Sequence, residues 1–170
     1  MEKIRVIAGR PGNGKTVEVY KDINYLLTDK NNFVFMVGYK QPEYPVNYIS
    51  NPDKPSHIPD NFQFFDETDL GVAVGKAIDL ARMAKRAGME EEVKVFLFSD
   101  CGKFELPAGS RNLYLAACEA GVNTTVVVQV FCQIDNGCPA WLLANCEPMI
   151  VSKFKSPRLA TPEEIQKTHR

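Results

Sequence analysis

Two short stretches of the chain carry residues whose types and spacing suit phosphate chemistry. The first, residues 9–16, matches the pattern G-x-x-x-x-G-K-T. Its glycines permit backbone conformations in which successive N–H groups point at phosphate oxygens. In this pattern the lysine reaches the β- and γ-phosphates and the threonine hydroxyl lies on Mg²⁺. The stretch predicts a site for ATP or GTP that is formed by Gly9, Arg10, Pro11, Gly12, Asn13, Gly14, Lys15 and Thr16.

The flanking residues supply the structural context that this motif requires. Residues 4–8 are an apolar run typical of a strand, and the apolar residues of 17–27 recur at helical spacing. A strand, the loop and then a helix also place the positive end of the helix dipole at the phosphates. The alternative is an ordinary glycine turn, but pattern and context together favour nucleotide binding.

The second stretch, residues 93–100, is an apolar run that ends in Asp100. In a parallel sheet the carboxyl end of such a strand lies beside the phosphate loop, where ligands bind. We therefore expect Asp100 to hold Mg²⁺ together with Thr16, directly or through water.

The residue that would polarise an attacking water is less evident. Cys101 follows Asp100 at the position where an acid often serves as the catalytic base. Glu105 is the first candidate for that base, and Glu67 and Glu119 are alternatives. If none of them reaches the site, hydrolysis is slow or the base comes from elsewhere.

The rest of the chain alternates between strand and helix patterns. Strands are expected at 33–37, 62–65, 124–132 and 149–154, and helices at 69–87, 108–121 and 139–146. Asp66 or Thr68 is expected to cap the helix at 69–87, and Gly88 to follow its end. This alternation predicts a three-layer α/β fold with a mainly parallel central sheet.

Length and composition indicate one domain over residues 1–170, with a proline-rich insertion at 40–61 and a polar C-terminal tail at 155–170. The insertion either faces DNA or a neighbouring subunit, or packs its aromatic residues on the domain. A net charge of −1 excludes a global field that draws the chain onto nucleic acid, so contact with DNA requires a local patch or a ring.

The sequence also bears on the cellular compartment. Five cysteines without C-x-x-C spacing indicate free thiols and a reducing compartment, with Cys101, Cys132 and Cys146 expected to be buried. Because no apolar run is long enough to span a bilayer and no signal peptide is evident, we expect a cytoplasmic protein.

One polar residue interrupts the apolar strand expected at 124–132. Gln129 needs hydrogen-bond partners if it is buried, and a γ-phosphate or its attacking water would serve, as would the neighbouring backbone.

The order of these parts resembles that of a known group of proteins. A phosphate loop, a long middle section, an Asp-ending strand, a helix and a Gln-bearing strand are typical of the additional-strand P-loop ATPases, in which one strand lies between the loop strand and the Asp strand. Residues 121–129 and 141–145 resemble the FtsK/HerA class of DNA-pumping ATPases. The compact viral members are more similar still: genome-packaging ATPases of membrane-containing icosahedral viruses, and zonula-occludens-toxin-like assembly ATPases of filamentous phages. The resemblance covers roughly residues 3–160.

This resemblance implies roles for individual residues. Lys15 and Asp100 would be catalytic, with Gln129 as the sensor of the γ-phosphate, although the spacing also suits Gln133. The family's catalytic acid has no match here, because Cys101 stands in its place, so Glu105 remains the candidate catalytic base on position alone. The finger that reaches a neighbour's nucleotide would be Arg111 or Arg158.

The resemblance further implies a Mg²⁺-dependent ATPase that works as a homo-oligomeric ring. It would grip the DNA backbone without reading sequence and move viral DNA into a preformed capsid, with capsid or membrane-vertex proteins as partners and association with the virion. The phage assembly proteins usually add a membrane segment, and its absence here favours packaging. Two alternatives remain open: a small-molecule or nucleotide kinase of the P-loop fold, and a nucleotide-binding assembly protein with slow hydrolysis, which Cys101 suggests.

Overall fold

One sheet contains every strand that the structure describes. The computed structural model describes residues 4–8, 15–38, 59–100, 109–128, 146–152 and 155–159, with the side chains of residues 4–7, 18–38, 59–100 and 109–127. The strands are β1 (Ile4–Ala8), β2 (Asn32–Gly38), β3 (Phe62–Asp66), β4 (Lys94–Asp100), β5 (Asn123–Val128), β6 (Cys146–Ser152) and β7 (Lys155–Leu159). Their order across the sheet is β3-β2-β4-β5-β1-β6-β7, and only the β6–β7 pair is antiparallel.

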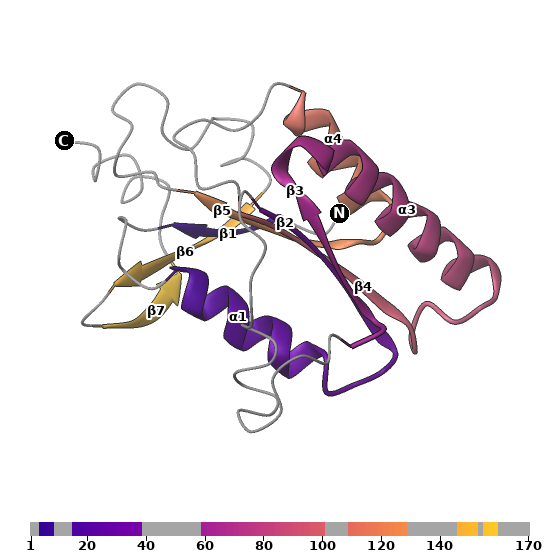
Figure 1. Cartoon of the computed structure of the whole chain (residues 1–170), viewed down its shortest axis with the longest axis horizontal. Helices are drawn as coiled ribbons and strands as arrows, with labels where there is room; N and C mark the ends of the chain where they lie inside the picture. The colour runs from indigo at the N-terminus through magenta and orange to yellow at the C-terminus, as the bar shows by residue number, and fades with distance from the viewer. Residues whose placement is uncertain are drawn as a thin grey trace.

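Helices cover both faces of this sheet. They are α1 (Lys15–Leu26), α3 (Leu70–Arg86) and α4 (Ser110–Glu119), with a 3₁₀ turn, η1 (Glu67–Asp69), before α3. Figure 1 shows α1 on one side of the sheet and α3 with α4 on the other. The expected three-layer α/β fold is therefore confirmed. Among the described residues, no helix combines the length and the apolar character that crossing a bilayer requires.

Each face of the sheet has its own apolar core, because successive side chains of a strand point to opposite faces. On the α1 face the cluster consists of Ile7, Val19, Ile23, Val34, Met36, Phe62, Phe98 and Val127. On the α3 and α4 face the buried members are Ile4, Val6, Val37, Phe65, Leu70, Ala73, Val74, Ala77, Val95, Leu97, Tyr114, Ala117, Cys118, Val122 and Val126. Of the cysteines, Cys118 is a buried thiol; Cys101 and Cys132 lie outside the described residues.

The ends of α3 and α4 follow from two glycines. Gly88 and Gly121 come shortly after the last helical residues and have φ of 69° and 89°. These positive values suit glycine, which has no Cβ to clash with the carbonyl of the left-handed turn. Gly88 therefore ends α3 as the sequence predicts.

The expected cap of α3 is wrong. Neither Asp66, which precedes η1, nor Asp69, which precedes α3, makes a side-chain cap hydrogen bond, and Thr68 lies inside η1. A 3₁₀ turn that runs directly into a helix supplies carbonyl acceptors for the first N–H groups, so a side-chain cap is not required.

The C-terminal part also differs from expectation. Cys146 begins strand β6 instead of ending a helix, since it pairs with Ile4 of β1. Residues 149–154 are not the last strand, because β7 pairs antiparallel with β6. Prolines within both strands, Pro148 and Pro157, hide this strand pattern from sequence analysis, because proline disfavours strands.

The two-layered core gives a direct test of the fold. Leu97 is fully buried in the middle of β4, so Leu97→Ala should lower the free energy of unfolding by about 3 kcal/mol through lost burial and a cavity. Val72, on the outer side of α3, is 53% exposed, and Val72→Ala should change it by less than about 0.5 kcal/mol. Urea unfolding followed by circular dichroism measures both, and equal losses would contradict this packing.

Candidate nucleotide and metal site

The strand register brings the two stretches with phosphate chemistry to one edge of the sheet. Asp100, the last residue of β4, pairs with Val127 of β5, and Val127 pairs with Ile7 of β1. Since neighbouring strands lie about 4.8 Å apart, the backbone of Asp100 is about 10 Å from that of Ile7. Ile7 is one residue from the end of β1, where the predicted phosphate loop begins. β5 is thus the single strand between the loop strand and the Asp strand.

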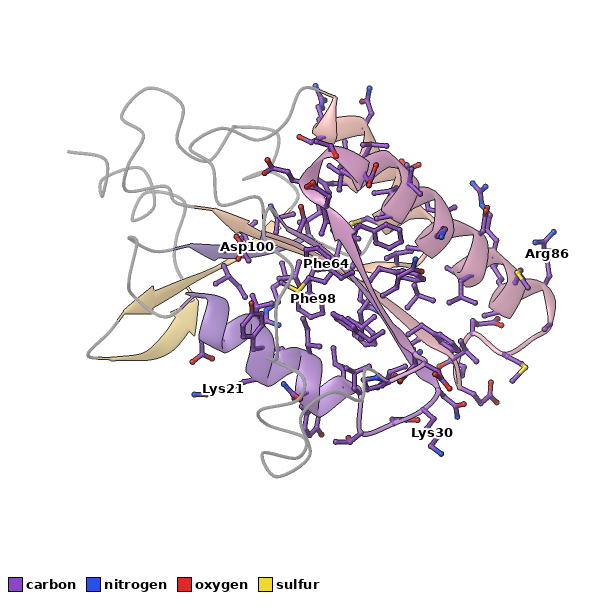
Figure 2. The ribbon with its side chains drawn as sticks, viewed as in Figure 1. Lys21, Lys30, Phe64, Arg86, Phe98 and Asp100 are labelled. Atoms are coloured by element: carbon purple, nitrogen blue, oxygen red, sulfur yellow. The ribbon has the colours of Figure 1, made fainter. Side chains whose placement is uncertain are left out.

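Asp100 also lies on the face of the sheet that carries α1. Phe98, two residues earlier in β4, packs in the same cluster as Val19 and Ile23 of α1. Because side chains two residues apart point to the same face, the carboxylate of Asp100 projects toward the α1 layer. Figure 2 shows Asp100 at the end of the sheet where α1 begins, whereas Lys30 lies at the opposite end. Asp100 lies at the edge of the sheet where α1 begins and on the face that α1 covers. Its half-buried carboxylate therefore points toward the start of α1.

The loop itself has the flanks that its motif demands. β1 ends at Ala8 and α1 begins at Lys15, so six residues connect them. Lys15 and Thr16 are the first two residues of α1, where free backbone N–H groups and the helix dipole favour an anion. Residues 9–14 and the side chains of Lys15 and Thr16 lie outside the described part of the structure, so their roles stay predictions.

An ion pair fixes α1 to the strand that precedes the loop. The Arg5 guanidinium of β1 lies 2.6 Å from the Asp22 carboxylate of α1, and both side chains are about one-third exposed, at 36% and 31%. A partly solvated pair of this kind contributes at most about 1 kcal/mol. Its geometric effect is larger, because it holds the helix that begins at Lys15 against β1.

Gly38 is a neighbour of Asp100 that sequence reasoning missed. It ends β2 and pairs with Asp100 on one side and Asp66 on the other. A Cβ at Gly38 would lie 3.2 Å from the backbone oxygen of Asp100 and 3.4 Å from the ring of Phe64. The bare glycine therefore leaves room beside Asp100, and only the strand order, not the sequence, reveals that contact.

The donor set fits magnesium. Mg²⁺ prefers oxygen ligands and is commonly bound by one or two protein groups together with substrate phosphates. A carboxylate from Asp100 and a hydroxyl from Thr16 would hold it, and it would neutralise charge on the transferred phosphate. Gly38 adds no side chain that would compete for this space.

Of the other candidates for catalytic residues, most lie outside the described part of the structure. Gln129 directly follows β5 but, like Gln133, Cys101 and Glu105, lies outside the described residues. Glu67 is half-buried in η1, immediately after β3, and therefore lies at the same edge as the metal-site acid.

Glu119 is at the wrong end of the sheet to act as the base. α4 leads back to the start of β5, and its last residue, Glu119, lines a pocket with Lys94 and Asn123, which begin β4 and β5. These are the amino ends of the strands. The suggestion that Glu119 reaches the phosphate site is therefore a misassignment.

Both candidates for the arginine finger belong to elements that lie nearer the edge of the sheet where β1 and β4 end. Arg111 is exposed in the first turn of α4, the helix that follows the Asp100 strand. Arg158 of β7 pairs with Ile150 of β6, which in turn pairs with Ala8 at the end of β1. The finger role stays a prediction for each.

Two solved structures resemble this arrangement. The first is an ATPase domain, which aligns with a TM-score of 0.52 and 18% identity, over 87% of this chain and 69% of that chain. The second is a DnaB-like replicative helicase, solved to show its interactions with primase, which aligns with a TM-score of 0.51 and 13% identity, over 93% of this chain and 54% of that chain. The chain has a P-loop NTPase fold.

This fold is mainly parallel and of the additional-strand type, as expected. No protein-family model and no curated protein matches the sequence. At these identities the likeness concerns the fold. The alignments cover 69% of the ATPase-domain chain but only 54%, about half, of the helicase chain.

The metal role of Asp100 can be tested against a matched acid. Asp100→Asn should reduce Mg²⁺-dependent ATP turnover by at least about 10-fold, because the carboxylate no longer holds the ion and even groups that only support a metal ligand cost about that much. Nucleotide affinity without Mg²⁺ should change little. Asp66 ends β3, pairs across Gly38 at the same level and is exposed, so Asp66→Asn should retain turnover. Equal effects of the two substitutions would refute the assignment.

Proposed function

We propose that this protein is a Mg²⁺-dependent ATPase that uses nucleotide hydrolysis to move along DNA as a ring. The observation that carries the proposal is the position of Asp100, at the same edge and on the same face of the sheet as the start of α1. That geometry matches a nucleotide–metal site whose loop is formed by residues 9–16.

The structural likeness supports the DNA part of the proposal. The similar chains are an ATPase domain and a DnaB-like replicative helicase, and replication is work on DNA. A ring would also explain how a chain with a net charge of −1 engages DNA, because a local contact is repeated in each subunit. Contacts would be made to the phosphate backbone, without sequence readout.

Packaging of viral DNA into a capsid is a narrower hypothesis. It rests on the sequence resemblance to FtsK/HerA-class packaging ATPases, while the similar solved structures are an ATPase domain and a helicase. The proposal therefore commits to a DNA-directed motor and leaves capsid or membrane-vertex partners to that resemblance.

The first prediction concerns Lys15. Lys15→Ala removes the ammonium that would contact the β- and γ-phosphates, so ATP affinity should fall at least about tenfold, the equivalent of a hydrogen bond to a charged group. Turnover should be lost. Lys21 lies on the same helix with its side chain 61% exposed, and Lys21→Ala should change neither quantity. Binding of a fluorescent ATP analogue and phosphate release measure both variants, and wild-type turnover in Lys15→Ala would reject the site.

The second prediction concerns DNA. Phosphate release should rise several-fold when single- or double-stranded DNA is added, and the stimulation should weaken as salt is raised, since backbone contacts release counterions. Particle mass should increase in ATP and Mg²⁺. Three results would count against the motor: no hydrolysis, phosphate transfer to a nucleoside or metabolite as in a kinase, or slow hydrolysis indifferent to DNA with ATP-dependent assembly.

A further inference from the structure

A buried pair of hydroxyl groups lies directly behind the metal-site acid. Ser99, the residue before Asp100, is completely buried and points to the opposite face of β4, toward the layer of α3 and α4. Tyr114, the fifth residue of α4, is completely buried there too. The Ser99 Oγ and the Tyr114 hydroxyl oxygen are 2.6 Å apart, and either group can donate the hydrogen bond.

Such a pair is costly to leave incomplete. A buried hydroxyl that loses a hydrogen bond carries a desolvation penalty, because bulk water does not reach it to replace that bond. The Tyr114 ring lies in the same apolar cluster as Leu97 and Val126. The bond therefore favours a single position of α4 relative to the end of β4.

The location of the bond matters more than its strength. Ser99 pairs with Val37 and Val126 through the backbone, so its strand position is held from both sides. Tyr114 adds a third constraint, perpendicular to the sheet, one residue before Asp100. Asp100, the last paired residue of β4, would otherwise be where strand pairing frays.

We propose that the Ser99–Tyr114 hydrogen bond positions Asp100 for Mg²⁺, and that α4 is linked to the metal site through it. Tyr114 is a positioning residue, since its hydroxyl touches Ser99 and not the nucleotide. The inference rests on the proposed function, because it assumes that Asp100 holds the metal. It adds that a displacement of α4, whose first turn carries the exposed Arg111, changes metal affinity.

The test is a magnesium titration of ATP turnover with Tyr114→Phe, which removes only the hydroxyl. The Mg²⁺ concentration for half-maximal turnover should rise on the order of fivefold, less than the 10- to 100-fold typical for groups that contact a metal ligand directly. ATP affinity measured without Mg²⁺ should stay within about twofold of wild type, because the phosphate loop is untouched. Ser99→Ala should give the same shift, and the double variant should add little, since both remove one bond.

A matched control separates positioning from general stability. Cys118, one turn further along α4 and also buried, lies away from the Asp100 edge. Cys118→Ala should lower the melting temperature, yet its Mg²⁺ dependence should equal that of the wild type. If Tyr114→Phe and Ser99→Ala lower the melting temperature and leave the Mg²⁺ dependence unchanged, the inference is wrong.

The possible failures are distinguishable. A wild-type protein without ATP turnover overturns the proposed function and this inference with it. Normal wild-type turnover with an unshifted Mg²⁺ requirement in both variants overturns the inference alone. Should Tyr114→Phe fail to fold, Ser99→Ala, which deletes one oxygen atom from a small side chain, decides the question by the same titration.

Discussion

The parallel register of three strands is the constraint on which the site depends. β4, β5 and β1 end at one edge, so Asp100 and Ala8 lie at that edge although more than ninety positions separate them in the chain. Because successive side chains of β4 point to opposite faces of the sheet, Asp100 lies on the α1 side and Ser99 on the α4 side. A slip of one residue in β4 would exchange those two faces and remove the acid from the site.

The two helical layers have different tasks. α1 begins directly after residues 9–14 and is held to β1 by the Arg5–Asp22 pair, so this layer would carry the nucleotide end of the proposed site. α4 packs on the opposite face and reaches the edge of the sheet through Tyr114. Asp100, the proposed metal ligand, thus stands at the end of β4 between the α1 layer and the layer that holds Tyr114.

Sequence analysis predicted the elements whose local pattern is strong. β1, β2 and β4 are apolar runs, and α3 has an apolar stripe of helical period, so propensity and packing agree there. It missed β7 and the start of β6 because proline disfavours strands, and the pairing of β6 with β1 and of β7 with β6 overrides that preference. Within the site, Asp100 was found from its strand, whereas Gly38 and Tyr114 carry no local signal: their contacts exist only once the strand order and the position of α4 are known.

The neighbours of β1 have a consequence for how the protein is made. β1 is synthesised long before the two strands that flank it, since β5 begins at Asn123 and β6 at Cys146. A ribosome must therefore release both of those strands before β1 finds its partners, and such non-local pairing slows folding. ATP bound at the proposed loop would stabilise only a chain in which β1 has already paired, so truncated products that lack β5 and β6 would gain no protection from it.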